Sequence, residues 1–234
     1  MLRRFLVGFL IIVTFAGCEE RPVAETNLGA NASATGTRDT TYSVPPQVVY
    51  RVDDHRFITL ENYNDCSGDT WYNDTKSGVR TKIGLTWPAG FRGELVVDDP
   101  TGMNVVIPTV STNLCGDRGC INYLAYSSDG GRSFNWLQYD DHAKSFDSVK
   151  SSGDYLMSVT KDSLYITQKI SDAGDTYTDR VPLAPGYVYG QDAKLPKGVG
   201  IESDAQLPRN LATPSGQKHY ACDNSIHDSK ATKK

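Results

Sequence analysis

The stretch Ser127-Ser-Asp-Gly-Gly-Arg-Ser-Phe134 carries the most regular pattern in this sequence and indicates a tight turn between two β-strands. In such a turn Asp129 can accept hydrogen bonds from the turn amides, because its short side chain reaches back to its own backbone. Gly131 permits the positive φ that a tight hairpin requires. Phe134 can pack its ring beneath the turn. The stretch therefore predicts a β-hairpin.

Two weaker patterns of the same kind accompany this hairpin. A degenerate copy, Asp172-Ala-Gly-Asp-Thr-Tyr177, begins 43 positions after Asp129, and a looser hairpin, Asp74-Thr-Lys-Ser-Gly-Val-Arg-Thr81, precedes both. The pattern resembles the Asp-box of sialidase-like β-propellers, and this spacing is typical of propeller blades. About 180 residues at about 45 per blade would give about four blades, which implies a small or incomplete propeller. A β-sandwich with similar hairpins is the alternative.

Short segments rich in β-branched and aromatic residues recur from Pro45 onward, each bounded by Gly, Pro, Asp or Asn. Such segments are typical of strands. No segment keeps apolar residues at helical spacing for three turns. We therefore predict one all-β domain of short antiparallel strands over residues 45–227. The expected strands are 48–52, 57–60, 93–97, 104–107, 121–126, 155–159 and 163–167.

The amino terminus has the features of a bacterial lipoprotein signal. Arg3 and Arg4 precede an apolar stretch that is too short to cross a bilayer comfortably, and small residues lead to Cys18. We predict a signal peptide over residues 1–17 and lipidation at Cys18, with an ordinary secretory signal as the alternative. Because Glu19 is not the aspartate associated with inner-membrane retention, we expect attachment to the outer membrane, facing the periplasm.

The segments at the two ends of the mature chain lack the apolar residues that a core needs. Residues 18–44 are rich in Ser, Thr, Ala, Gly and Asn, so their burial could not offset the entropy of ordering them. We predict a flexible lipidated tether there and a disordered polar tail over residues 228–234. The domain between them is long enough for a real core.

Four cysteines follow Cys18, and an even number in an oxidising compartment indicates two disulfides. Three pairings are possible. We favour Cys115 with Cys120, because Gly116 and Gly119 let the chain curl back between them; Cys66 would then pair with Cys222. A zinc site is a poor match, since one Cys-x4-Cys pair and two distant cysteines do not give tetrahedral spacing.

The remaining motifs argue for binding more than for catalysis. The formal net charge of −4 and the absence of a basic stripe argue against nucleic acid. The sequence contains no Gly-x-Ser-x-Gly elbow and no phosphate-binding Gly-Lys loop. The triplets Asp53-Asp54-His55 and Asp140-Asp141-His142 lack metal-ligand spacing and are interpreted as solvated turn residues. We expect no catalytic residue, no metal and no cofactor.

Thirteen tyrosines are a further candidate feature. Tyr139, Tyr187 and Tyr189 lie in loop-like surroundings, and exposed tyrosines often anchor protein interfaces. The alternative, which we favour for any single tyrosine, is that the ring fills the β core with its hydroxyl at the rim.

Three stretches together resemble the periplasmic immunity lipoproteins that are paired with type VI secretion phospholipase effectors. They are Pro45–Phe57, the region from Asp65-Cys66 to Thr81, and Leu207–Ile226, whose Thr-Pro-Ser-Gly…Cys-Asp pattern is the most specific part. In that family cysteines matching Cys66 and Cys222 recur, and a turn similar to the one at Asp129 is present.

The resemblance implies a non-enzymatic inhibitor. Its partner would be a cognate lipase effector, bound in the periplasm, and its only membrane contact would be the lipid anchor. The binding residues stay unassigned, although we expect exposed tyrosines and acidic loop residues to contribute. The alternative is an envelope lipoprotein with a propeller-like carbohydrate-binding or glycan-processing role.

Overall fold

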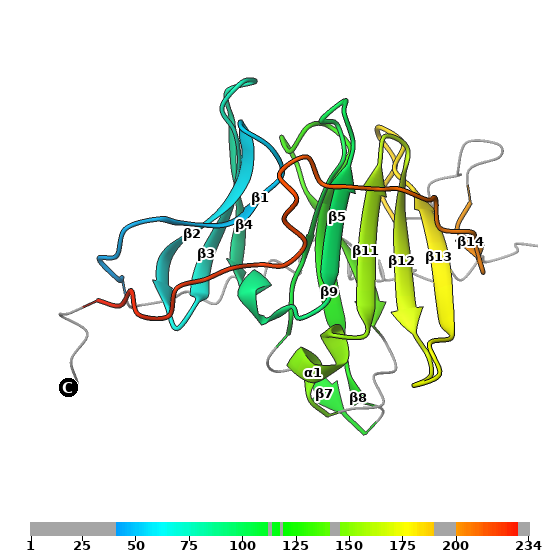
Figure 1. Ribbon diagram of the computed structural model, residues 1–234. Coiled ribbons are helices and arrows are strands. Elements are labelled where there is room, and N and C mark those ends of the chain that lie inside the picture. Colours follow the sequence, from blue (N-terminus) through cyan, green and yellow to red (C-terminus); the bar gives the residue numbers. More distant parts are fainter. Residues whose placement is uncertain (1–40, 112–113, 118, 141–145, 190–199, 229–234) are drawn as a thin grey trace, which may run out of the picture.

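The computed structural model describes residues 41–111, 114–117, 119–140, 146–189 and 200–228. The first sheet is an antiparallel meander in which the strands are neighbours in chain order (Figure 1). Its strands are β1 (Gln47–Arg51), β2 (Arg56–Asn64), β3 (Ser67–Asp74) and β4 (Val79–Thr86).

The second sheet has the order β10-β9-β6 and the third has the order β14-β13-β12-β11-β5. Strands β5 and β11 run parallel, because the whole second sheet lies between them in the chain and supplies the crossover. The second sheet comprises β6 (Val105–Pro108), β9 (Asn122–Ser127) and β10 (Asn135–Asp140). The third comprises β5 (Glu94–Asp98), β11 (Tyr155–Thr160), β12 (Ser163–Lys169), β13 (Thr176–Pro182) and β14 (Glu202–Ser203).

The remaining elements are short. A ribbon is formed by β7 (Cys115–Gly116) and β8 (Gly119–Cys120), and the helical turns are η1 (Pro88–Gly90) and α1 (Ser148–Ser152). Within the described ranges, no helix has the length and apolar character needed to cross a bilayer.

Aromatic rings connect the three sheets inside the core. Tyr50 of β1 packs against Tyr220 of the C-terminal segment, with ring centroids 5.4 Å apart. Phe91, directly after η1, contacts both Tyr220 and Tyr139 of β10. Tyr139 in turn contacts Tyr155 of β11 at 5.0 Å. Each sheet therefore contributes a ring to one continuous aromatic cluster.

Residues 213–223, which we call the C-terminal strap, join the first sheet to the third (Figure 1, orange to red). The amide of Leu95 in β5 donates to the carbonyl of Lys218 at 2.8 Å. Three residues later the amide of Ala221 donates to the carbonyl of Val49 in β1, also at 2.8 Å. The strap thus occupies hydrogen-bonding groups of two edge strands that would otherwise be open to pairing with another chain.

Both disulfides are present, with the pairing that the sequence favours. Cys66 is bonded to Cys222 and fixes the end of the strap to the turn after β2. Cys115 is bonded to Cys120 and closes the β7–β8 ribbon. The first bridge spans 156 positions and the second spans 5.

The all-β prediction is confirmed, and all seven expected strands are present with small changes in their bounds. Strands β3, β4, β10 and β13 were not among them, and each flanks one of the three predicted hairpin turns. The length-based estimate of about four blades is too high for the described residues, which form three sheets of three or more strands and no closed barrel.

Candidate functional site

The predicted hairpin at Asp129 connects β9 and β10 and is held by side-chain hydrogen bonds. The carboxylate of Asp129 accepts from the amides of Arg132 and Ser133, both at 3.0 Å, and from the hydroxyl of Ser133. Gly131 has φ +79° and packs against the ring of Tyr72, which also contacts Phe134. Burial alone would raise the pKa of Asp129, but these hydrogen bonds outweigh it and lower the pKa. The Asp129 carboxylate therefore stabilises the turn between β9 and β10.

The second copy of the pattern also forms a hairpin, between β12 and β13, but a different residue holds it. Asp172 makes a 3.8 Å ion pair with Lys169, and no turn amide donates to it. The turn is held by Ser171, whose hydroxyl donates to Asp175 and accepts from the amide of that residue. The expected equivalence of Asp172 and Asp129 is therefore wrong.

The triplet Asp53-Asp54-His55 forms the β1–β2 turn. Its three possible ligand atoms lie within 4.8 Å of one another. However, both oxygens of Asp53 accept hydrogen bonds from Arg56, and His55 Nδ1 lies 2.8 Å from Asp74. Two of the three side chains, Asp53 and His55, therefore have structural partners outside the triplet, and the triplet links two neighbouring turns.

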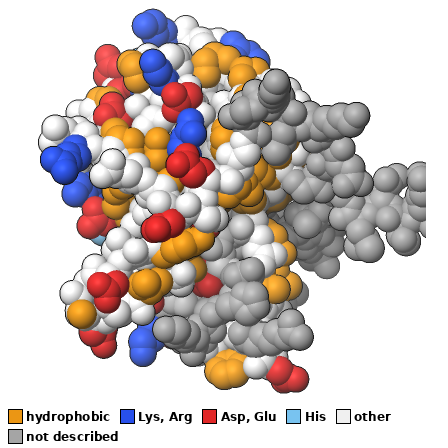
Figure 2. Space-filling view, turned by 90° about the vertical axis from the view of Figure 1, so that its right-hand side faces the viewer, with side chains coloured by type: hydrophobic (Ala, Val, Ile, Leu, Met, Phe, Trp, Pro, Cys, Tyr) orange, Lys and Arg blue, Asp and Glu red, His pale blue; other side chains and the backbone are white. Residues whose placement is uncertain are grey.

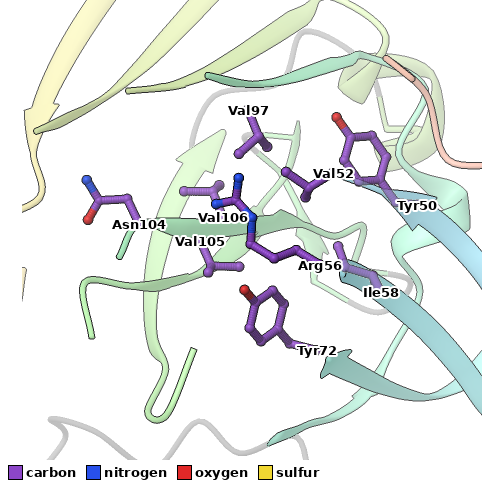
Figure 3. Close-up of a pocket in the computed structure, with 9 residues that line it drawn as sticks. All are labelled: Tyr50, Val52, Arg56, Ile58, Tyr72, Val97, Asn104, Val105 and Val106. Carbon is purple, nitrogen blue, oxygen red and sulfur yellow. The ribbon is translucent and has the colours of Figure 1, made fainter. Parts of the chain in front are cut away.

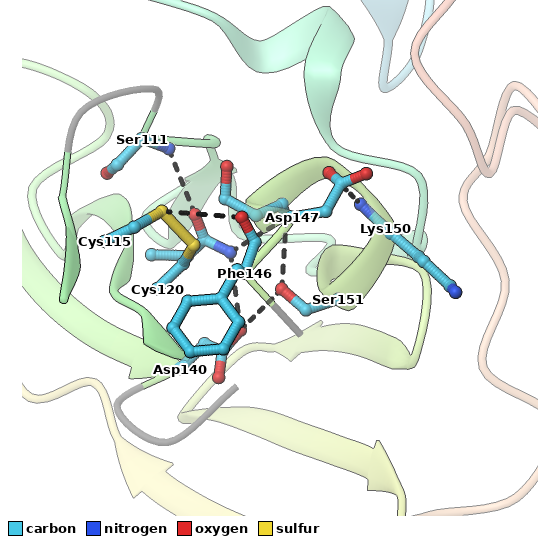
Figure 4. Close-up of a disulfide and its surroundings, with 10 residues drawn as sticks. Ser111, Cys115, Cys120, Asp140, Phe146, Asp147, Lys150 and Ser151 are labelled. Atoms are coloured by element: carbon cyan, nitrogen blue, oxygen red, sulfur yellow. Dashed lines mark hydrogen bonds between the residues drawn. A yellow bond between two sulfur atoms is a disulfide. The ribbon is translucent and has the colours of Figure 1, made fainter. Parts of the chain in front are cut away.

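Asp140, from the second triplet, is not a solvated turn residue. It ends β10 with 1% of its surface exposed and accepts from the hydroxyl of Ser151 in α1 (Figure 4). The prediction of a solvated position is wrong here, because this carboxylate fixes the only α-helix of the described residues against the second sheet. Asp141 and His142 lie outside the described residues, as does Cys18.

A small cavity lies on the inner side of the first sheet (Figure 3). It encloses about 10 Å³, room for a single water molecule. The guanidinium of Arg56 reaches into it among valine side chains, paired with Asp53 and donating to the carbonyl of Asp99. The hydroxyl of Tyr72 has no hydrogen-bond partner there. A cavity of this size does not accommodate a sugar or a phospholipid.

The opposite side of the first sheet, which we call the outer face, carries aromatic and charged side chains that point away from the core. Cross-strand pairing arranges them in rows across the four strands. One row is Val48–Thr59–Trp71–Lys82; the next is Arg51–Phe57–Asn73–Arg80; Glu61 and Asp69 form a pair beside the first row.

A bulge in β1 helps to build this face. The register shifts between Val48 and Tyr50, so that Val49 and Tyr50 are both fully buried while Val48 stays 43% exposed. Arg51 then returns to the outer side opposite Phe57. The bulge therefore places two consecutive residues of β1, Val49 and Tyr50, in the core, while Val48 and Arg51 stay on the outer face.

Trp71 is the centre of the outer face. The guanidinium of Arg80 lies 3.9 Å from its ring centroid, and the ammonium of Lys82 lies 5.9 Å from it. Each cation also has an acid: Arg80 lies 2.8 Å from Glu61, and Lys82 lies 2.9 Å from Asp69. The indole is therefore flanked by two cations that are themselves held in place by carboxylates.

The neighbouring row is held in a similar way. The guanidinium of Arg51 lies 5.1 Å from the ring centroid of Phe57. Asn73 donates to the hydroxyl of Thr59 at 3.0 Å, and that hydroxyl donates to Glu61. Tryptophan, phenylalanine and arginine are enriched in protein interfaces, so a face that presents all three in fixed positions is suited to binding another protein.

The tyrosines singled out in the sequence, for which a core position was favoured one by one, lie elsewhere. Tyr139 is buried and its hydroxyl donates to the carbonyl of Thr109, so it is a core residue. Tyr187 packs on Tyr189, with centroids 4.7 Å apart, and Tyr189 packs on Tyr126. The alternation of Arg80 and Lys82 with Val79 and Ile83 was the sequence signal for an exposed strand face, and it was missed.

Exposed apolar side chains also occur at the β13–β14 end of the molecule. Ile170, Tyr177 and Ile201 are exposed there, beside an ion pair between Arg180 and Glu202. Figure 2 views this end and shows apolar side chains interrupted by charges of both signs. Phe146, 72% exposed, lies beside the Cys115–Cys120 disulfide at another edge (Figure 4).

Comparison with known protein families gives the identity of the chain. Residues 42–168 match the family described as T6SS Tli3 immunity protein, where T6SS is the type VI secretion system. The chain belongs to this family. An immunity protein binds a cognate effector and is not an enzyme, so the prediction of a non-enzymatic protein is confirmed. No curated protein matches the chain.

The Tli3 match covers the first two sheets, whereas the β12–β13 turn, the β13–β14 end and the strap lie beyond it. It includes the whole outer face and the hairpin at Asp129, and it ends within β12. The resemblance to type VI secretion immunity proteins is therefore confirmed over the part of the chain that forms the first two sheets.

Proposed function

We propose that this chain binds and neutralises a type VI secretion lipase effector in the periplasm, held at the membrane by a lipid on Cys18. The observation that carries the proposal is membership of the Tli3 immunity family in a chain whose amino terminus has lipoprotein-signal features. The resemblance of three stretches to immunity proteins paired with phospholipase effectors supports a lipase as the partner.

The proposed anchor fits the task. A lipase attacks phospholipids at the membrane surface, so an inhibitor must meet it there. A flexible tether of about 26 residues has a typical span of about 28 Å, which holds the domain near the bilayer at high effective concentration. The described residues begin at Thr41, and the amide of Tyr42 donates to Asn62 near the end of β2.

Protection of cells tests the proposal. The proposed cognate lipase is directed to the periplasm of a sensitive strain, together with either the full chain or a chain lacking residues 1–17. We expect survival with the full chain and lysis with the shortened one, because the shortened chain stays in the cytoplasm. Equal protection by both, or lysis with the full chain, would contradict the proposal.

The anchor is tested separately with Cys18→Ser. We expect this substitution to move the protein from the membrane fraction to the soluble periplasm or to leave an unprocessed precursor. Unchanged fractionation together with an unchanged mass would show that Cys18 carries no lipid.

A further inference from the structure

We propose that the outer face of the first sheet is the surface that contacts the effector, and that the contacting element of the effector is acidic and carries apolar side chains. This inference rests on the proposed function and deepens it by naming the surface and the chemistry of the partner.

The first step of the argument is the charge on the face. Its two acids, Glu61 and Asp69, each have a cation as partner. The third cation, Arg51, lies over Phe57 and has no carboxylate within ion-pair distance among the described residues. The face therefore has an excess positive charge on a chain whose formal net charge is −4. A partner that complements it brings a carboxylate to Arg51.

The second step is the fixed position of the anchors. Arg80 donates to both oxygens of Glu61 at 2.8 Å while it stacks on Trp71, so its long side chain is ordered before any partner arrives. Ordering a flexible side chain on binding normally costs free energy. A face that is already ordered avoids this cost, and the partly exposed rings of Trp71 and Phe57 supply apolar area next to the charges.

The third step separates a protein from a membrane as the occupant. Anionic phospholipid surfaces are recognised by clusters of about four or more basic side chains, whereas on this face Arg80 and Lys82 are already paired with Glu61 and Asp69, which leaves only Arg51 for a headgroup. A protein surface can place acids opposite Arg51 and donors opposite the two carboxylates. The mixture of charges favours a protein.

The β13–β14 end is the competing surface. Arg180 and Lys169 there form ion pairs with Glu202 and Asp172, and Ile170 and Ile201 are exposed. Figure 2 shows apolar and charged side chains intermixed at this end. Among the described residues this end offers no cation that stacks on a ring, so it serves as the matched control surface.

The test measures the affinity of the full chain for the purified cognate lipase of the proposed function. Trp71→Ala should weaken binding about 30-fold or more, as expected for a central interface tryptophan. Arg51→Glu should weaken it about tenfold or more, with a larger loss at low salt. Glu61→Gln should weaken binding by less than Trp71→Ala does, because it removes the carboxylate that orders Arg80 over Trp71 but leaves the ring in place. Tyr177→Ala with Lys169→Glu should change nothing, and all variants should keep the wild-type melting temperature.

Opposite results overturn the assignment in distinguishable ways. Wild-type affinity in Trp71→Ala and Arg51→Glu would place the interface elsewhere and leave the proposed function intact. No binding of the lipase by the wild-type chain would remove the proposed function and this inference together. Arg51-dependent binding to vesicles of phosphatidylethanolamine and phosphatidylglycerol, with lipase binding unaffected, would identify the outer face as a membrane surface and overturn the inference.

Discussion

Aspartates at hairpin turns recur as the smallest structural unit of this protein. Asp74, between β3 and β4, accepts from the amides of Lys76 and Ser77 and from the hydroxyl of Ser77, in the manner of Asp129. His55 adds a hydrogen bond from the neighbouring turn. A carboxylate with this many donors is stabilised in its charged form. The charged side chains of Asp74 and Asp129 therefore stabilise the turns in which they lie.

The ionisation of Asp74 gives the first prediction. Burial alone would raise the pKa of Asp74, but hydrogen bonds from Ser77, His55 and the turn amides lower the pKa from 3.8 to about 2. A lowered pKa stabilises the folded state above the unfolded value of 3.8, and this contribution is lost as the pH falls toward 2. We expect Asp74→Asn to lower the melting temperature at pH 7 and to match wild type near pH 2. A constant difference across that range would contradict the assignment.

Gly131 gives the second prediction. It combines φ +79° with a position where a Cβ would overlap the ring of Tyr72, whereas Gly78, at φ +68°, has open space. Gly78→Ala should cost about 1 kcal/mol of unfolding free energy, from backbone strain alone. Gly131→Ala should cost roughly 3 kcal/mol or more, because Tyr72 must also move. Urea denaturation measures both. Equal losses would show that the contact with Tyr72 is unimportant.

Among the elements, hairpins were predictable from sequence and the strap was not. A hairpin is a local structure, so Asp129 with Gly131, or Asp74 with Gly78, determines where two strands meet. The strap has no regular secondary structure, and its partners Leu95 and Val49 are more than a hundred positions away in the chain. Only Cys222, whose pairing with Cys66 was favoured from sequence, indicated that the end of the chain returns to the first sheet.

The strap also explains why one disulfide should matter more than the other. Chain-entropy estimates give about 5 kcal/mol for a loop as long as Cys66–Cys222 and about 2 kcal/mol for one as short as Cys115–Cys120. The long bridge also holds the strap that joins β1 to β5. We expect Cys66→Ser with Cys222→Ser to lower the melting temperature more than Cys115→Ser with Cys120→Ser. The reverse order would contradict the structural role of the strap.

At the scale of the whole molecule, the first described residues lie beside the sheet that carries the outer face. Asn62 accepts from the amide of Tyr42 and contacts Asp69, which belongs to the outer face. The proposed lipid anchor would therefore keep the proposed binding surface close to a membrane. The binding face itself was not predictable from sequence, because cross-strand neighbours such as Arg51 and Phe57, or Trp71 and Arg80, are brought together only by the register of the folded sheet.

The central claim is that this immunity protein neutralises a lipase by binding it in a fixed ratio. The most direct measurement is the phospholipase activity of the proposed cognate lipase, purified and titrated with the domain beginning at Thr41. We predict that activity falls linearly and reaches its minimum near one equivalent of domain. Full lipase activity in the presence of excess folded domain would contradict the account.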